Sequence, residues 1–344
     1  MLSIYGKSGR RFCDGLSRRS FLNIGALGLA GANLPNLLRA ERKAGLGRSH
    51  KAIINVLLPG GAPHQDMVDL KPDAPSDVRG EFKPIATNVP GIQISEHMPR
   101  MAKMMDKFAI IRSLADSQSG HDLYQCLTAL PRNTRGMTGG IASIGAWVSR
   151  LYGSDRDGIP AHLSLMHPTG HRQWGDPGEG GFLGRQHGPF RLAKGNGDNT
   201  GLDTVENMTL SDLSLERLQD RRALRGSFDK FRRDLNDAGD FGSLDEFEQQ
   251  ALGILSSSKM AGALDLSKED PKVLERYGKP DPEWRADGAP KMTTNFLLAR
   301  RLVEAGARYV SLNFSRWDWH SDNFGRGRVD IPMLDQALCA LVED

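Results

Sequence analysis

Short apolar runs alternate along this chain with segments in which apolar residues recur at helical spacing. Runs that are rich in β-branched residues predict strands at residues 52–58, 108–111, 161–166 and 308–314. Helical spacing predicts helices at residues 98–105, 140–152, 271–277, 292–305 and 331–344. The first run is apolar at nearly every position, which is typical of a strand buried on both faces of a parallel sheet. The alternation predicts an α/β fold, in which a mainly parallel sheet is sandwiched by helices.

The middle of the chain has a different pattern. Residues 174–201 are rich in Gly, Asp and Asn and predict a long surface loop, and residues 213–235 carry apolar residues among many charges, as an amphipathic helix or helical pair does. We therefore expect one domain over residues 49–344 with a loop and helical insertion at about 174–290. The last predicted helix stops at acidic residues without a capping glycine or a returning strand, which predicts missing C-terminal strands.

The N-terminal residues 1–48 have the pattern of an export leader. Arg18 and Arg19 precede a weakly apolar run at residues 23–38, as in signals read by the twin-arginine export machinery. The alternative is an amphipathic first helix of a cytosolic domain. The leader predicts export in the folded state, to the periplasm or the cell exterior. No later stretch approaches the roughly 18 apolar residues of a membrane span, so we expect no transmembrane anchor in the mature chain.

Charge and cysteine content exclude several classes of function. Lys and Arg number 45 and Asp and Glu number 42, so the chain has no basic field that would hold nucleic acid. The three cysteines, Cys13, Cys126 and Cys339, lack CxxC spacing, and Cys13 lies in the leader.

Two predicted strand ends carry side chains that can bind metal. His64, Asp66 and Asp69 follow the first strand, and a second group follows the late strand: Asp318, His320 and Asp322. Alternate spacing places the second group on one side of an extended segment. Carboxylates with an imidazole suit a divalent ion such as Zn, Mn, Mg or Ca. The alternative is a plain turn after the first strand and a solvated loop after the late one.

Ser113 and His121 form a third candidate group near the end of the run at residues 108–111. A serine at a strand end can act as a nucleophile that a metal activates, with His121 orienting it or binding substrate. The alternative, which isolated Ser and His residues favour, is that they cap helices or lie on the surface.

Several ordered motifs resemble the exported bacterial family called domain of unknown function 1501. They include Leu58-Pro-Gly-Gly61 with His64 and Asp66, Asp69-Leu-Lys-Pro-Asp-Ala-Pro75, Ser95-Glu-His-Met-Pro99, Ile111-Arg-Ser113 with His121, Gly181-Phe-Leu-Gly184 and Trp317-Asp318-Trp319-His320. That family is similar in fold to the alkaline phosphatase and sulfatase superfamily. The resemblance implies that Asp66, Asp318 and His320 are metal ligands. One residue separates Asp318 from His320, whereas phosphatase-like members usually have three, so Asp322 is an alternative to His320.

The resemblance also implies that two later ligand-bearing segments, Glu-Phe-Gly-Arg and Gly-Arg-Asp-His-Trp, are absent from this sequence. The function expected from these observations is metal-dependent hydrolysis of phosphate or sulfate esters, with a small-molecule or glycan ester as substrate. Without the missing segments the chain is expected to be inactive or unstable. The competing expectation is a non-catalytic exported protein that uses the same scaffold to bind a partner, a glycan or a structural metal.

Overall fold

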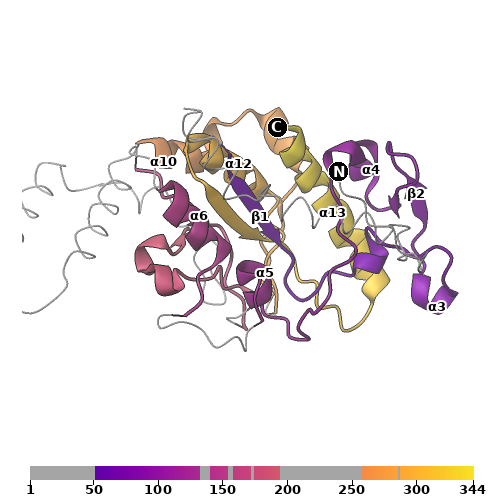
Figure 1. The fold of residues 1–344 in the computed structure, drawn as a ribbon. Helices are drawn as coiled ribbons and strands as arrows, with labels where there is room; N and C mark the ends of the chain where they lie inside the picture. Colours follow the sequence, from indigo (N-terminus) through magenta and orange to yellow (C-terminus); the bar gives the residue numbers. More distant parts are fainter. Residues whose placement is uncertain (1–50, 132–139, 154–157, 172–173, 194–257, 286) are drawn as a thin grey trace, which may run out of the picture. The chain divides into compact units, whose positions relative to one another are not determined.

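The computed structural model describes residues 51–131, 140–153, 158–171, 174–193, 258–285 and 287–344. The predicted leader and the predicted helices at residues 213–235 lie outside these described residues. Residues Ile111–Ser113 group apart from the unit that comprises Ala52–Ile110 and Leu114–Asp344. The description below concerns that larger unit, whose elements are drawn in Figure 1.

A parallel sheet organises this unit. Its strand order is β1-β6-β4-β5, and every pair in it is parallel. The strands span Ile53–Leu57 (β1), His162–Ser164 (β4), Phe190–Arg191 (β5) and Tyr309–Asn313 (β6). The predicted α/β class with a mainly parallel sheet is confirmed.

Three predictions about the strands are wrong in detail. β1 lies at an edge of the described sheet, and Ile53 is 44 % exposed, so the strand is not buried on both faces. The apolar run at residues 108–111 forms no strand: Phe108 and Ile110 pack against the core instead, and Ile111 is exposed. The predicted loop at residues 174–201 contains β5. An apolar run indicates that its side chains are buried, but it does not indicate which segments pair by backbone hydrogen bonds in the sheet.

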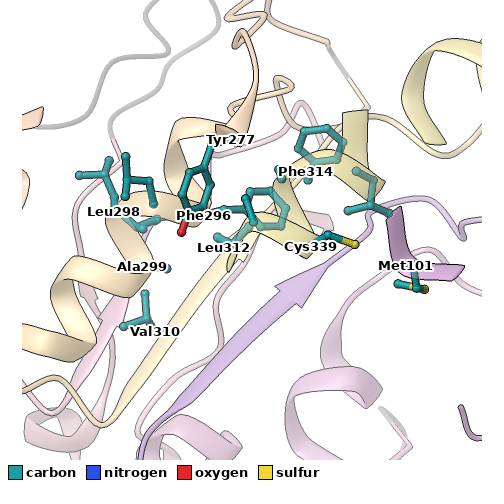
Figure 2. Packing of buried hydrophobic residues seen from close by; sticks show 14 of the residues in the cluster. Met101, Tyr277, Phe296, Leu298, Ala299, Val310, Leu312, Phe314 and Cys339 are labelled. Carbon is teal, nitrogen blue, oxygen red and sulfur yellow. The ribbon is translucent and has the colours of Figure 1, made fainter. Parts of the chain in front are cut away.

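The apolar face of the sheet carries the main core. Val310, Leu312 and then Phe314 alternate along the chain to one side, where they pack with residues of helix α12, Thr294–Ala305 (Figure 2). The rings of Phe296 on α12 and Phe314 lie 5.6 Å apart and nearly perpendicular. Burial of this apolar area is the main force that holds α12 on the sheet.

The opposite face is more polar. His162 and Tyr309 are neighbours across β4 and β6, and their rings make a T-shaped contact at 5.1 Å. Helix α6, Ile144–Tyr152, packs here, and a Cβ added to Gly145 would lie 2.3 Å from Nε2 of His162. Only a glycine therefore permits this approach of helix and sheet. The Ser143 side chain caps α6 by accepting a hydrogen bond from the backbone N–H of Ala146.

The long helix α13, Asn323–Glu343, includes the predicted helix at residues 331–344 and begins earlier. It packs against α4, α11 and α12. The Asp335 carboxylate accepts the backbone N–H groups of Arg100 and Met101 at the first turn of α4. A side chain of α13 thus satisfies donors that a helix start leaves open.

The remaining described elements are short. The α-helices are α3 (Ser76–Arg79), α4 (Pro99–Lys103), α5 (Tyr124–Thr128), α10 (Ser258–Leu264) and α11 (Pro271–Tyr277). The 3-10 helices are η1 (His64–Asp66), η2 (Met105–Lys107), η4 (Gly181–Leu183), η5 (Arg185–His187) and η6 (Leu266–Lys268), and β2 (Pro84–Ala86) pairs antiparallel with β3 (Gln93–Ser95). Of the helices in the described ranges, none is long and apolar enough to cross a bilayer.

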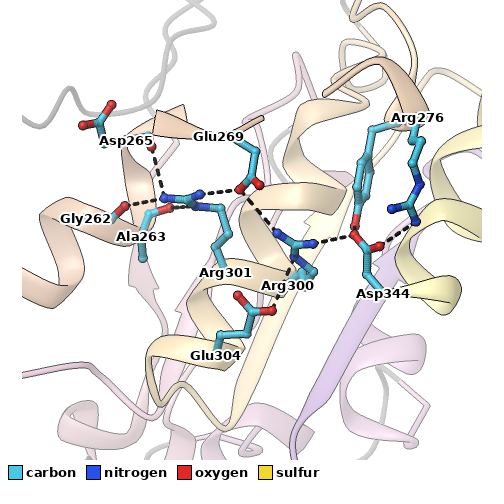
Figure 3. A network of polar contacts seen from close by, with 10 residues as sticks. Gly262, Ala263, Asp265, Glu269, Arg276, Arg300, Arg301, Glu304 and Asp344 are labelled. Carbon is cyan, nitrogen blue, oxygen red and sulfur yellow. Dashed lines mark hydrogen bonds and ion pairs between the residues drawn. The ribbon is translucent and has the colours of Figure 1, made fainter. Parts of the chain in front are cut away.

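Arginines join α10, α11, α12 and the last residue of the chain. Arg301 donates to the backbone carbonyls of Gly262, Ala263 and Asp265 and also contacts Glu269 (Figure 3). Arg300 contacts Glu269 at 3.3 Å and Asp344 at 2.5 Å, and Arg276 pairs with Asp344 from the other side at 2.5 Å. We call Arg276, Arg300 and Arg301 with these partners the α12 arginine cluster.

Candidate functional site

The segment that follows β6 is held rigidly by two tryptophans. The indole N–H of Trp317 donates to the carbonyl of Phe314, and that of Trp319 donates to the carbonyl of Arg316, both at 2.7 Å. Their rings lie 5.2 Å apart, and both residues are buried. Asp318 lies between these two anchors, so its backbone position is fixed.

Asp318 packs directly on the loop that follows β1. A Cβ added to Gly60 would lie 2.4 Å from the backbone nitrogen of Asp318, and the φ of Gly60 is +94°. The backbone N–H of Trp317 donates to the carbonyl of Pro59 at 2.9 Å. Because β1 and β6 are parallel neighbours, their carboxyl ends meet at one edge of the sheet. Gly60 is the residue type that allows this approach.

Two imidazoles contact the Asp318 carboxylate. Nε2 of His320 lies 2.7 Å from Oδ2, and Nε2 of His121 lies 3.6 Å from Oδ1. Asp318 is buried, whereas the side chains of His121 and His320 are 40 % and 73 % exposed. A buried carboxylate that holds two exposed imidazoles is a group that can bind and transfer protons.

His121 also rests on an aromatic partner. Its ring lies 4.8 Å from that of Trp174 in a T-shaped contact, and Trp174 lies 4.7 Å from the ring of His171 on another side. Nε2 of His171 is 3.9 Å from the Asp287 carboxylate, which pairs with Arg316 at 2.8 Å. The sequence pattern singled out neither Trp174 nor Asp287. A tryptophan in a Gly-rich loop is a signal that could have drawn attention to this neighbourhood.

Asp66 lies in a different setting. It is a buried residue of η1, and a Cβ added to Gly80 would lie 3.0 Å from its Oδ1. Burial raises the pKa of Asp66 above its usual range, although the charge of His64 opposes this shift. No hydrogen bond or ion pair joins Asp66 to Asp318 or His320 within the described ranges. The metal role predicted for Asp66 stays a prediction.

The other acidic candidates face elsewhere. Asp69 pairs with Lys71 at 2.7 Å and lies 3.7 Å from His64. Asp322 has a left-handed backbone with a φ of 51°, and its carboxylate lies over Gly325 in the first turn of α13. The turn breaks the alternation that placed Asp322 on the side of Asp318 and His320.

Ser113 belongs to the segment that groups apart from the unit that contains Asp318, and it is exposed. Its role as a nucleophile stays a prediction. His121, which the sequence paired with Ser113, is the residue of that pair that the structure places beside Asp318.

The donor types around Asp318 fit a divalent ion of borderline hardness, because they are one carboxylate and two imidazoles. As placed, each imidazole contacts its own oxygen of the carboxylate. In the part of the chain that the structure describes, no group of three or more His, Cys, Asp or Glu side chains is arranged to hold a metal ion.

Comparison with known proteins gives one match. The family described as "Protein of unknown function (DUF1501)" matches residues 50–344. No curated protein and no solved structure matches the chain.

Proposed function

Because this chain belongs to the DUF1501 family and holds a buried Asp318 between two exposed imidazoles, we propose that it is a metal-dependent hydrolase of phosphate or sulfate esters. The observation that carries this proposal is the contact of both Nε2 atoms with one carboxylate at the carboxyl edge of the sheet. Ligands of open α/β sheets bind at that edge. The proposal includes a fold similar to that of the alkaline phosphatase and sulfatase superfamily.

The described residues supply the proton chemistry. When Nε2 of His320 donates to Asp318, its Nδ1 carries the lone pair and can accept a proton from water. His121 lies at the other oxygen and can donate a proton to the leaving alcohol. The Asp318 carboxylate orients both rings and stabilises whichever imidazole becomes charged.

The metal would be held by Asp318, by Nδ1 of His320 and by Asp66 as the further predicted ligand, in which case His121 is the group left for proton transfer. A divalent ion there supplies positive charge that lowers the pKa of water and offsets the charge on the ester oxygens.

The test compares Asp318→Asn with Asp77→Asn, since Asp77 is an exposed carboxylate on α3 outside the site. Hydrolysis of aryl phosphate and aryl sulfate is measured with Zn, Mn, Mg or Ca, together with bound metal by elemental analysis. We expect Asp318→Asn to lose activity by about a hundred-fold or more and to bind less metal, whereas Asp77→Asn changes neither. Equal activity and equal metal in the two variants would show that the proposal is wrong.

Ser113→Ala and Asp66→Asn assign the remaining predicted roles. Loss of turnover with unchanged metal content in Ser113→Ala supports the nucleophile, and unchanged turnover excludes it. Loss of metal in Asp66→Asn supports a ligand role.

We further propose export by the twin-arginine route, which rests on Arg18 and Arg19 before the apolar run at residues 23–38. A reporter fused behind residues 1–48 is expected outside the cytoplasm. Replacing both arginines by lysine is expected to retain the reporter inside, and a reporter that is still exported would contradict the proposal.

A further inference from the structure

A cavity, which we call the α13 cavity, lies next to the start of α13. It has a volume of about 480 Å³ and is lined by residues of the segment after β6, by residues of the first turns of α13, and by Glu283, Trp284, Arg285 and Lys291. His121, Asp318 and His320 do not line it. The cavity is therefore a separate feature, and its role does not depend on the proposed hydrolysis.

The charges around the cavity are mostly paired within the protein. Lys291 and Asp330 form a buried ion pair at 2.6 Å, and Ser315 donates to the same aspartate. Arg285 pairs with Asp281 and Glu283, and Arg316 pairs with Asp287. These groups stabilise the wall and have little charge left for a ligand.

Arg326 is different. It lines the cavity and is only partly buried, and within the described residues its guanidinium has no hydrogen bond or ion pair. An arginine offers five N–H donors in a planar fork that suits a carboxylate, a sulfate or a phosphate. Its free donors make it the group of this cavity that can take an anion.

The other available groups suit a sugar ring. Trp284 and Trp319 both line the cavity, and Trp284 is 36 % exposed. The flat face of an indole matches the C–H face of a pyranose in area and polarity. Glu283 and Asp322 also line the cavity, and their carboxylate oxygens accept hydrogen bonds from hydroxyl groups.

The pairing of these charges limits the number of anionic groups that a ligand can carry. Three of the lining cations are paired with carboxylates of the protein: Arg285, Lys291 and Arg316. Arg326 is left for one anionic group, whereas a highly charged chain would also meet the carboxylates of Glu283 and Asp322.

We propose that this cavity binds one acidic unit of a saccharide. Arg326 takes its anionic group, the indole of Trp284 packs on its ring, and Glu283 and Asp322 accept its hydroxyl groups. The anionic group is a carboxylate, a sulfate or a phosphate, which share the chemistry that an arginine recognises.

The test is calorimetric titration of the full chain with four probes: methyl glucuronide, glucose 6-sulfate, glucose 6-phosphate and neutral methyl glucoside. We expect at least one acidic probe to bind about ten-fold or more tightly than the neutral one. The best acidic probe identifies the source of the anion.

Single substitutions distinguish the predicted roles of Arg326 and Trp284. Arg326→Ala is expected to remove the preference for acidic probes, and Arg326→Lys is expected to restore part of it. Trp284→Ala is expected to weaken all probes. The matched control is Arg328→Ala, because Arg328 lies on the same helix, pairs with Glu81 and does not line the cavity. Thermal melting of each variant verifies folding.

Two results would overturn the proposal. The first is equal binding of acidic and neutral probes, or no binding of any. The second is an effect of Arg326→Ala no larger than that of Arg328→Ala. Asp318→Asn is expected to bind the acidic probe normally, so a failure of the hydrolase proposal and a failure of this one are distinguishable.

Discussion

The arginines of the α12 arginine cluster and Arg326 of the α13 cavity differ in how many of their N–H donors are used. Arg301 donates to three backbone carbonyls and contacts Glu269, and Arg300 contacts three carboxylates. Arg326 has no such partner among the described residues. A guanidinium whose donors are mostly used holds protein segments together, and one with free donors has capacity for a ligand.

Lys291 shows that a cation that lines the cavity is not necessarily available to a ligand. It lines the same cavity as Arg326, yet its ammonium is buried against Asp330. We therefore expect it to behave as the paired arginines do, and to affect stability more than binding. The first prediction below tests this expectation for Lys291 and has the largest expected effect.

Lys291→Met is expected to cost about 3–5 kcal/mol of unfolding free energy, because it leaves the buried Asp330 carboxylate without its cation. Urea unfolding measures the loss. The double variant Lys291→Met with Asp330→Asn should regain part of it, since no buried charge is left unpaired. A single variant that loses less than about 1 kcal/mol would show that the pair is not structural.

A fall in pH is expected to destabilise the fold through a buried group that carries no charge. Burial lowers the pKa of His162 to about 4, and its Nδ1 lies 3.1 Å from the carbonyl of His187, to which it donates. Below about pH 6.5 the unfolded chain takes up a proton at this histidine, whereas the folded chain does not until about pH 4. The contribution of His162 to the unfolding free energy is therefore fully present above about pH 6.5, and it declines as the pH falls from about 6.5 to about 4.

Between about pH 7 and about pH 5 the expected loss from His162 is about 2 kcal/mol of unfolding free energy. His162→Phe keeps the ring against Tyr309 and should reduce the slope of stability against pH. His167, whose pKa burial also lowers to about 4, retains its own contribution. An unchanged slope in His162→Phe would contradict the assignment.

Arg301→Ala is expected to cost about 2–3 kcal/mol, because it leaves carbonyls of Gly262, Ala263 and Asp265 without a donor. Arg301→Lys keeps the charge but offers fewer donors in a different geometry, and we expect an intermediate loss. Urea unfolding of both variants beside Arg326→Ala tests the comparison directly. Arg326→Ala should change stability by less than about 0.5 kcal/mol, as substitutions away from such contacts do.

The sequence predicted three of the four strands of the described sheet, β1, β4 and β6. Strand ends that point to the same edge of a parallel sheet were enough to expect residues after β1 near Asp318, and Gly60 meets it there. The alternate spacing of Asp318, His320 and Asp322 did not reveal the left-handed backbone of Asp322. A turn changes the direction of the backbone, and the pattern of residue types along the sequence does not show it. The partner of Asp318 at long range, His121, was predicted for another role.

Nothing in the sequence indicated the α13 cavity. Trp284, Arg316 and Arg326 come from segments that have no shared period or motif, and only the folded structure brings them to one cavity. The free donors of Arg326 are likewise a property of its surroundings. Ordinary arginines and tryptophans in a sequence do not tell which of them have partners.

The smallest expected effect concerns Arg276, the exposed member of the α12 arginine cluster. Its side chain is 41 % exposed and pairs with Asp344 at 2.5 Å and with Glu343 at 3.4 Å. Water screens such a pair, so Arg276→Ala should lower the unfolding free energy by only about 0.5 kcal/mol, and about 1 M salt should remove most of the difference. Arg301→Ala is the control, because its loss comes from hydrogen bonds to carbonyls and should persist in salt. The prediction would be wrong if Arg276→Ala lost as much unfolding free energy as Arg301→Ala and the loss persisted in salt. Solvent exposure would then not determine how much each arginine of the cluster contributes to stability.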